Sequence, residues 1–468
     1  MKGTAHFKIF CMSENLFNDF EPVLSKQWKQ QIQYELKGAD YNETLVWESP
    51  ESVKVKPFYH IDEAKEPITS GGKATAFTIC QNIFVHDVDK SAGRVASTLK
   101  RGAESIRLTI TDENTDVTKL IANIPSGIPV YFNLNFLSIT FVKNLDAIAK
   151  EKGMVFFVQL DPIGQLAKDG NWFGSLESDF EALNTIAIAC TNIHFLSVDG
   201  SLYQNAGANI VQQIVYTLAH ANEYFNRIAT IYKPVVLQVA VGTNYFFEIA
   251  KLRTLRLLFG TIAKEYGHNT ECHIIAAPTK RNKTLYDYNV NMLRTTTECM
   301  SAILGGADSV SNLAYDALYH KDNEFGDRIA RNQLLVLKHE SYFDKVNNPA
   351  DGAYYIEELT QQLAEKALAL FKDIEANGGF LSQLKEGTIQ RKIQESATKE
   401  QELFDSGKEV LLGTNKYPNK NDRMSHDLEL YPFVKANPRK TLITPIIEKR
   451  LAEKMEQERL EQEKVSNS

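Results

Sequence analysis

Three side chains that could bind a metal ion follow the first apolar stretch of the chain. His86, Asp87 and Asp89 offer an imidazole and two carboxylates, which are common ligands of divalent cations. Three such residues in a polar loop more often mark the solvated start of a helix, where an aspartate can cap the first turn. We therefore predict the start of a helix here, and no metal site.

Cationic and thiol side chains are the other candidates for chemistry. Lys280, Arg281 and Lys283 form a small basic cluster that could meet phosphate groups, although a surface loop is the better interpretation. The cysteines are odd in number and widely spaced, and several lie in apolar stretches, which favours buried reduced thiols over disulfides or a metal cluster. They are Cys11, Cys80, Cys190, Cys272 and Cys299.

Eight short apolar stretches, each followed by a helical pattern, must position these residues. A strand followed by a helix, repeated eight times, predicts parallel strands with right-handed crossovers that close into an α/β fold of the (β/α)8 barrel type. An open doubly wound sheet is the alternative, but no Gly-x-Gly-x-x-Gly follows the first strand. The expected strands are Ala76–Ile79, Ser105–Ile110, Val130–Leu134, Met154–Val158, Ile193–Val198, Val235–Ala240, His273–Ala276 and Asp308–Ser311.

The predicted domain organisation places the barrel between two extensions. An N-terminal arm for subunit contact covers residues 1–70, the barrel 71–345, C-terminal helices packed on the barrel 346–417, and a charged tail 418–468. The glutamate-rich segment Glu448–Lys464 is predicted to be a solvated or frayed helix, with a partner-docking helix as the alternative. Helices are also expected over Ser25–Lys37, Ile210–Arg227, Phe246–Tyr266, Tyr355–Glu375 and Leu381–Ser406.

Composition excludes several classes of protein. The 468 residues suffice for one large domain with a deep core, and 43% hydrophobic and 24% charged residues are ordinary for a globular protein. A net charge of -7 gives no general attraction to nucleic acid or to an anionic membrane. No secretory signal opens the chain and no apolar run is long enough to span a bilayer, so we expect a cytoplasmic protein.

Six blocks of sequence occur here in the same order as in a known family of proteins. They are Lys37–Glu48, Asn244–Arg253, Arg328–Asn332, Asn348–Leu359, Asp405–Gly407 and Gly413–Tyr417. Asn244–Arg253 reads Asn-Tyr-Phe-Phe-Glu-Ile-Ala-Lys-Leu-Arg, and the family typically has Asn-Phe-Phe-Met-Glu-Val-Ala-Lys-Met-Arg after its sixth strand. The chain is thereby identified as a member of the methylmalonyl-CoA mutase family, and Lys37–Glu48 resembles the corresponding segment of the small subunit.

One turn resembles the family's active-site turn but differs at two positions. It reads Asp-Gly-Ser-Leu-Tyr-Gln-Asn-Ala-Gly-Ala over Asp199–Ala208, where catalytic chains have Ser-Gly-Tyr-His-Met-Gln-Glu-Ala-Gly-Ala. The resemblance places Ser201 and Leu202 where the family's tyrosine and histidine face the substrate. A leucine cannot donate a hydrogen bond to a thioester carbonyl. The chain therefore resembles the non-catalytic partner of the enzyme.

Other active-site positions of the family are also changed. Eight residues beyond Asp161, where the family has the arginine that clamps the substrate carboxylate, this chain has Asp169, which would repel a carboxylate. The family's tyrosine after the first strand falls near Asn82, and its Arg-Thr-His-Ser-Gln-Thr after the seventh falls on Ile275–Lys280. Gln159 is retained, although a glutamine can equally bond the backbone. We expect no catalytic, cofactor-binding or metal-binding residue in this chain.

The resemblance also implies a cofactor and a substrate path. The family isomerises methylmalonyl-CoA and succinyl-CoA with adenosylcobalamin, held in a separate domain by Asp-x-His-x-x-Gly, but none of the ten histidines here follows an aspartate by two residues. Only residues 418–468 follow Tyr417, so we expect the cobalamin-binding domain to lie on the partner chain. Family substrates thread their CoA arm through the barrel axis, whereas bulky residues in Val130–Leu134 and Met154–Val158 predict a filled bore and no CoA tunnel.

These patterns together predict the small, non-catalytic subunit of a heterodimeric methylmalonyl-CoA mutase, an isomerase, which stabilises the catalytic large subunit. The arm around Trp47, Pro57, Phe58 and Tyr59 is the expected contact with that subunit, because an extended segment without its own core needs a surface to cover. Two alternatives stay open. One is an active acyl-CoA mutase barrel chain that works with a separate cobalamin-binding subunit, and the other is a free-standing barrel scaffold with another partner.

Overall fold

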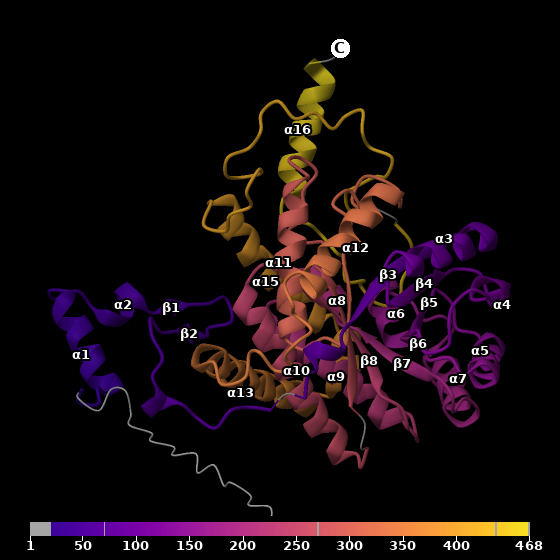
Figure 1. Ribbon diagram of the computed structural model, residues 1–468, viewed down its shortest axis with the longest axis horizontal. Coiled ribbons are helices and arrows are strands. Elements are labelled where there is room, and N and C mark those ends of the chain that lie inside the picture. The colour runs from indigo at the N-terminus through magenta and orange to yellow at the C-terminus, as the bar shows by residue number, and fades with distance from the viewer. Residues whose placement is uncertain (1–19, 70, 269–270, 436–437, 467–468) are drawn as a thin grey trace, which may run out of the picture.

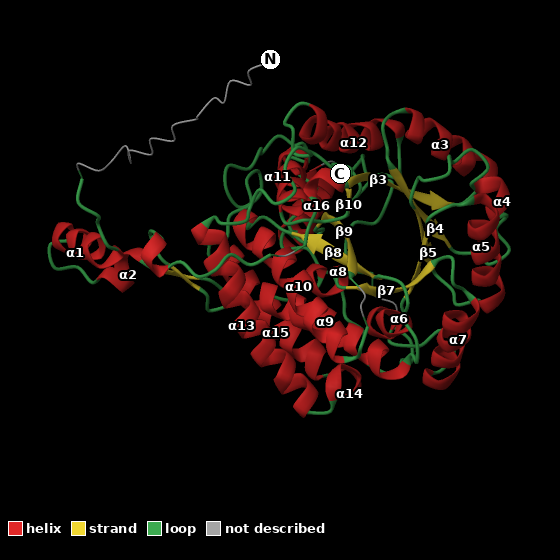
Figure 2. Cartoon of the chain, turned by 60° about the horizontal axis from the view of Figure 1, so that its bottom comes forward, coloured by secondary structure: helices red, strands yellow, loops and turns green. Residues whose placement is uncertain are grey.

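The barrel predicted from the alternating strands and helices is confirmed in a computed structural model, which describes residues 20–69, 71–268, 271–435 and 438–466. Eight parallel strands close in the order β10, β3, β4, β5, β6, β7, β8, β9, so the sheet is not open (Figure 2). The strands are β3 Thr78–Val85, β4 Ser105–Ile110, β5 Val130–Leu134, β6 Phe156–Leu160, β7 His194–Asp199, β8 Val235–Val241, β9 Cys272–Pro278 and β10 Ser309–Ser311.

Helices surround these strands on the outside of the barrel (Figure 2). The predicted helices Ile210–Arg227 and Phe246–Tyr266 are confirmed as α9 and α10, the second with a shift of one residue at each end. The helices around the barrel are α3 Val88–Lys100, α4 Val117–Leu120, α5 Ile139–Lys152, α6 Pro162–Asp169, α7 Leu176–Ala189, α8 Ser201–Asn205, α9 Ile210–Arg227, α10 Tyr245–Glu265, α11 Val290–Leu304 and α12 Glu324–His339.

The bounds of two strands, β3 and β6, differ from those predicted, and the difference changes the position of two candidate residues. β3 continues to Val85 instead of ending at Ile79, because parallel pairing with β4 extends to the register pair Val85 and Ile110. β6 spans Phe156–Leu160 instead of Met154–Val158. Asn82 and Gln159 therefore lie within strands, and not in the loops after them.

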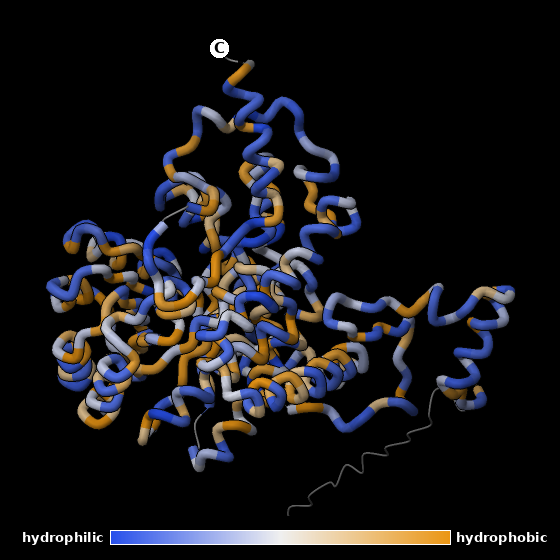
Figure 3. The backbone as a smooth tube through the Cα atoms, turned by 180° about the vertical axis from the view of Figure 1, so that it is seen from behind, coloured by the Kyte–Doolittle hydropathy of each residue, from blue (hydrophilic) through white to orange (hydrophobic). Residues whose placement is uncertain are grey.

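Side-chain alternation along the strands divides the apolar core in two. Outward-facing residues such as Phe132 and Leu237 join the helices in one large cluster. Inward-facing Cys80, Tyr131 and Phe157 belong to a second, smaller cluster inside the bore. Figure 3 shows strongly hydrophobic stretches gathered in the middle of the molecule.

The C-terminal helices pack on one side of the barrel. The predicted helix Tyr355–Glu375 is confirmed as α13, Tyr354–Ala376, which packs along α9 and α10. The single helix predicted over Leu381–Ser406 is wrong, because α14 Gly379–Lys385 and α15 Thr388–Asp405 are separated at Gly387. This glycine has φ of +78°, a left-handed conformation that ends one helix and starts the next.

The charged tail packs against the chain instead of standing in solvent. A helix, α16, is present over Glu453–Ser466, but Leu460 and the acidic residues Glu456 and Glu463 are buried. Glu456 accepts a hydrogen bond from the backbone of Leu285 at 2.7 Å. The prediction of a solvated helix is therefore wrong, because the carboxylates find backbone and side-chain donors far away in sequence.

The arm extends from the barrel at the side of α13 and α10 (Figure 1). It contains α1 Ser25–Glu35, α2 Tyr41–Leu45, the antiparallel pair β1 Trp47–Glu48 and β2 Lys54–Val55, and the short 3-10 helix Ile61–Glu63; a second 3-10 helix, Ala74–Ala76, leads into β3. Part of the arm covers this chain's own surface, since Trp47 packs edge-on against Phe247 of α10. α1 lies at the outer end of the arm, away from the barrel (Figure 1).

The cysteines behave as predicted where they are described. Cys80, Cys190, Cys272 and Cys299 are buried and free, and Cys11 lies outside the described residues. Across the described ranges, no helix is both long and apolar enough to cross a bilayer.

Candidate functional site

Aromatic rings fill the amino-terminal half of the barrel bore. Phe157 stacks with Tyr131, His194 and His273, at centroid distances of 4.8, 4.2 and 4.3 Å. The Tyr131 hydroxyl also bonds His273 Nε2 at 2.8 Å. Burial lowers the pKa of His194 to about 4 and also lowers the pKa of His273. The prediction that bulky side chains fill the bore is confirmed, and both imidazoles are neutral near pH 7.

Polar side chains line the other half of the bore, toward the carboxyl ends of the strands. Arg107 on β4 donates from Nε to Gln159 Oε1 at 2.8 Å and from Nη2 to Gln238 Oε1. Burial lowers the pKa of Arg107, and the nearby Asp199 opposes that shift. Arg107 was not predicted as a site residue from the sequence. The signal was nevertheless present, because Ser105, Arg107 and Thr109 alternate with apolar residues along β4. That alternation places all three on the inner face of the barrel.

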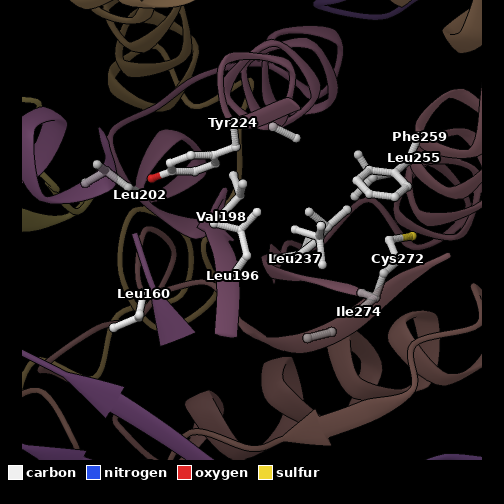
Figure 4. Close-up of a cluster of buried hydrophobic side chains, with 14 of the residues drawn as sticks. Leu160, Leu196, Val198, Leu202, Tyr224, Leu237, Leu255, Phe259, Cys272 and Ile274 are labelled. Atoms are coloured by element: carbon white, nitrogen blue, oxygen red, sulfur yellow. The ribbon is translucent and has the colours of Figure 1, made fainter. Parts of the chain in front are cut away.

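Both residues of the altered turn are held by contacts within this chain. The Ser201 hydroxyl at the start of α8 donates to Asp199 Oδ1 at 2.5 Å. Leu202 is only 2% exposed and belongs to the main core outside the strands. Figure 4 shows Leu202 among apolar side chains, with Val198 and Tyr224 nearby.

A buried hydrogen-bond network holds this turn in place from behind. Asp161, at the N-cap of α6, accepts from the Tyr224 hydroxyl at 2.6 Å and from the Asp199 amide at 2.7 Å. His220 Nε2 lies 2.8 Å from Asp161 Oδ1, and His220 Nδ1 bonds the Tyr203 hydroxyl at 2.9 Å. Burial alone would raise the pKa of Asp161, but His220 and the hydrogen bonds outweigh it and lower that pKa. The His220 side chain is fully buried, so the network holds the backbone of the turn from behind.

Asp169 does not project a free carboxylate. It is the last residue of α6, and its carboxylate forms an ion pair with Arg439 of the segment that leads to α16. The adjacent Gly170 carbonyl accepts from the backbone of Leu442 at 3.0 Å. The C-terminal segment therefore crosses the loop after β6 and neutralises the acid there.

The basic cluster is not the surface loop that we predicted. Arg281 and Lys283 are buried, and each pairs with an acid: Arg281 with Glu400 at 2.5 Å and Lys283 with Glu298 at 2.7 Å. Lys280 pairs with Glu448 at 3.1 Å. The loop is buried because α15 and the C-terminal segment cover it, and each cation is already neutralised.

The residues near His86 confirm the start of a helix. Asp87 caps α3 by accepting from the Lys90 amide at 2.8 Å, and Asp89 pairs with Lys119 at 2.6 Å. Within the described residues, no group of three or more histidine, cysteine, aspartate or glutamate side chains could hold a metal ion.

Three histidines in and beside the barrel bore do not fit cobalt coordination by a base-off corrinoid. Such a ligand needs an exposed imidazole whose other nitrogen is held by an acid. His194 and His273 are stacked on Phe157, and His220 is enclosed between Asp161 and Tyr203. These three imidazoles are therefore not free to coordinate cobalt.

The closed eight-stranded barrel and the six sequence blocks together point to one family of barrel proteins, and comparison with known sequences identifies the same family. The chain belongs to the methylmalonyl-CoA mutase family, whose sequence model matches residues 100–463. The methylmalonyl-CoA mutase small subunit of Porphyromonas gingivalis is 30% identical over 446 residues, covering 87% of this chain and 71% of that protein.

Two further relatives mark the range of similarity. The methylmalonyl-CoA mutase small subunit of Streptomyces virginiae is 24% identical over 453 residues, with 87% of this chain and 73% of that protein covered. The methylmalonyl-CoA mutase of Rhizobium meliloti is 28% identical over 466 residues, and the match covers 85% of this chain but only 64% of that protein.

Proposed function

We propose that this chain is the small, non-catalytic subunit of a heterodimeric, adenosylcobalamin-dependent methylmalonyl-CoA mutase. Its large subunit would bind the cofactor and isomerise methylmalonyl-CoA and succinyl-CoA. The observation that carries the proposal is the bore itself. Phe157 stacks on Tyr131 across the path that a CoA arm would take, while Leu202 packs in the core where the family has a histidine.

The outer part of the arm is the proposed contact with the large subunit. Its exposed apolar side chains gather on α1 and just before it, at Phe20, Leu24, Trp28 and Tyr34, whose exposed fractions range from 47% to 81%. Exposed apolar side chains close together typically mark a protein interface. Trp47 and Tyr59, which the sequence pointed to, instead contact Phe247 and Tyr355 of this chain. The docking surface therefore begins further toward the N-terminus than Trp47.

Co-purification tests the proposal directly. The full chain is co-expressed with a tagged mutase large subunit that carries Asp-x-His-x-x-Gly, and the eluate is analysed by size-exclusion chromatography. We expect a one-to-one complex that isomerises methylmalonyl-CoA when adenosylcobalamin is added, and no isomerisation by this chain alone. A chain that stays monomeric beside the large subunit would contradict the proposed role.

A pair of matched variants shows whether the arm contacts the large subunit, because each removes one exposed tyrosine and only one of the two tyrosines lies on the arm. Tyr34 on α1 is 81% exposed, and Tyr232, in the loop before β8, is 74% exposed. Tyr34→Ser should weaken the heterodimer by about tenfold or more, as expected for an aromatic anchor. Tyr232→Ser should leave it unchanged. Equal effects of the two substitutions would remove the arm from the interface.

The alternative function is an acyl-CoA mutase barrel that works with a separate cobalamin-binding subunit. Mixing the chain with adenosylcobalamin and such a subunit, and assaying several acyl-CoA esters, tests it. Turnover that is lost in the Gln159→Leu variant would favour this alternative, since Gln159 is the retained family residue in the bore.

A further inference from the structure

Arg107 is a cation inside the barrel that has no acidic hydrogen-bond partner. Its guanidinium donates to the neutral amides of Gln159 and Gln238, and in the described part of the chain it forms no ion pair. Asp199 acts on Arg107 electrostatically, but its Oδ1 accepts from Ser201 instead. A cation whose hydrogen-bond partners are neutral amides can still form a charge-assisted bond with an anion.

Gln159 adds an unpaired donor beside this cation. Its side chain is 3% exposed, and its Oε1 is occupied by Arg107 Nε. This bond fixes the orientation of the amide, because a flipped amide would point its own N–H groups at the guanidinium. Gln159 Nε2 is buried and has no hydrogen-bond partner, although buried donors are normally paired.

Asn82 adds an unpaired acceptor on the neighbouring strand. It lies in register with Arg107 across β3 and β4, and its Oδ1 is buried without a partner. Both Arg107 and Asn82 are nevertheless partly exposed as whole residues. A cation on β4 is thus bonded to an amide with an unpaired donor and stands in register with a residue that has an unpaired acceptor.

We propose that this group binds a small hydroxycarboxylate. The carboxylate would pair with Arg107, the hydroxyl oxygen would accept from Gln159 Nε2, and the hydroxyl hydrogen would be donated to Asn82 Oδ1. Water could occupy the two neutral positions, but only an anion would give Arg107 a charged hydrogen-bond partner, since Asp199 acts on it without a hydrogen bond. A large ligand does not fit, because the stacked rings of Tyr131 and Phe157 close the bore below. The site does not depend on the proposed subunit role.

Titration of the full chain with three probes tests the site. Lactate carries both groups, acetate lacks the hydroxyl, and lactamide lacks the charge. Calorimetry or ligand-observed NMR should show binding of lactate, about tenfold weaker binding of acetate, and no binding of lactamide. Equal binding of all three, or no binding of lactate, overturns the proposal. Phosphate that displaces lactate and binds more tightly overturns it as well, since it would indicate a general anion site.

Variants then assign the contacts. Gln159→Leu should reduce the affinity for lactate to that for acetate, and Arg107→Met should abolish binding of both. The exposed substitutions Gln394→Leu and Arg391→Met on α15 are matched controls and should change neither affinity. An undiminished preference for lactate in Gln159→Leu contradicts the proposal. Should Arg107→Met fail to fold, as judged by circular dichroism, the Gln159→Leu result decides.

Discussion

Arg253 on α10 donates to Glu357 on α13 at 2.7 Å, and so joins two of the sequence blocks that identify the family. The same guanidinium pairs with Asp351 at 3.1 Å and bonds the carbonyl of Ile68 at the end of the arm. Arg253 is 1% exposed. In this chain the two blocks therefore fasten the end of the arm and α13 to α10, outside the bore.

Removal of the Arg253 charge should destabilise the protein strongly. Arg253→Met leaves the carboxylates of Glu357 and Asp351 without their cation, which costs about 3–5 kcal/mol when a buried pair is broken. Urea denaturation followed by circular dichroism measures the loss. Arg391→Met, which removes an exposed pair with Glu395, is the control and should change the unfolding free energy by about 0.5 kcal/mol or less. Similar midpoints for the two variants would contradict this assignment.

Asp161→Asn tests the network behind the active-site turn. The variant loses the charge that faces His220 while keeping the side-chain shape, and we expect a loss of about 2–4 kcal/mol. Because the folded pKa of Asp161 is lowered, its stabilisation is present above the unfolded pKa and disappears as the pH falls through the folded pKa. The difference between wild type and variant should therefore shrink in acid. A constant difference down to about pH 3 would contradict the lowered pKa.

Two glycine-to-alanine substitutions should change the stability in opposite directions. Gly207 tests the packing of the active-site turn, and Gly93 in α3 is the contrast. Gly207 has φ of +100°, and a Cβ there would lie 2.5 Å from the Cβ of Ala397 on α15. Gly207→Ala should destabilise by about 2–4 kcal/mol, because both backbone and neighbour must move. Gly93, within α3, has open space around it, so Gly93→Ala should stabilise by about 0.5–1 kcal/mol. Thermal unfolding of both variants measures the signs.

His194 should make the protein less stable in mild acid. The unfolded residue titrates near pH 6.5, whereas burial lowers the folded pKa to about 4. Between these values the unfolded chain binds a proton that the folded chain excludes, so stability falls as the pH falls. His194→Phe should retain about 1–3 kcal/mol more stability than wild type at about pH 4.5, with both referred to pH 7.

The pKa of His320 is shifted in the opposite direction to that of His194. Burial works to lower its pKa, but Asp427 and Asp316 outweigh burial and raise it. Its stabilisation is thus present below the unfolded pKa and is lost as the pH rises through the folded pKa. His320→Gln should therefore cost relatively more stability in acid than at neutral pH. The same sign of change for both histidine variants would contradict the assigned environments.

The barrel could be predicted from the sequence because its signals are local. Eight apolar stretches and the helical spacing of α9 and α10 require no knowledge of distant contacts. The ends of the strands were harder to predict from the sequence. The polar Gln81 and Asn82 interrupt the apolar pattern, and they belong to β3 because they pair with β4. β3 ends six residues and β6 two residues beyond the predicted ends, and these extensions place Asn82 and Gln159 within strands.

The candidate site was harder to predict because its partners are distant in sequence. Resemblance located Ser201, Leu202 and Asp169, but it could not reveal that Leu202 turns into the core or that Arg439 neutralises Asp169. Arg107 carried a signal in its alternating neighbours. Its meaning depended on Gln159 and Gln238, which follow it by many residues and meet it only when the barrel closes.

The buried acids of α16 set an order for folding during synthesis. Glu463 accepts from the Tyr286 hydroxyl at 2.7 Å and from the backbone amides of Met424 and Ser425 at 3.0 Å each. Those donors leave the ribosome long before Glu463 does, and domains assemble from the N-terminus as they emerge. The Tyr286 hydroxyl and the amides of Met424 and Ser425 therefore lack this acceptor until Glu463 has emerged, and a chain terminated before Glu463 never gains it.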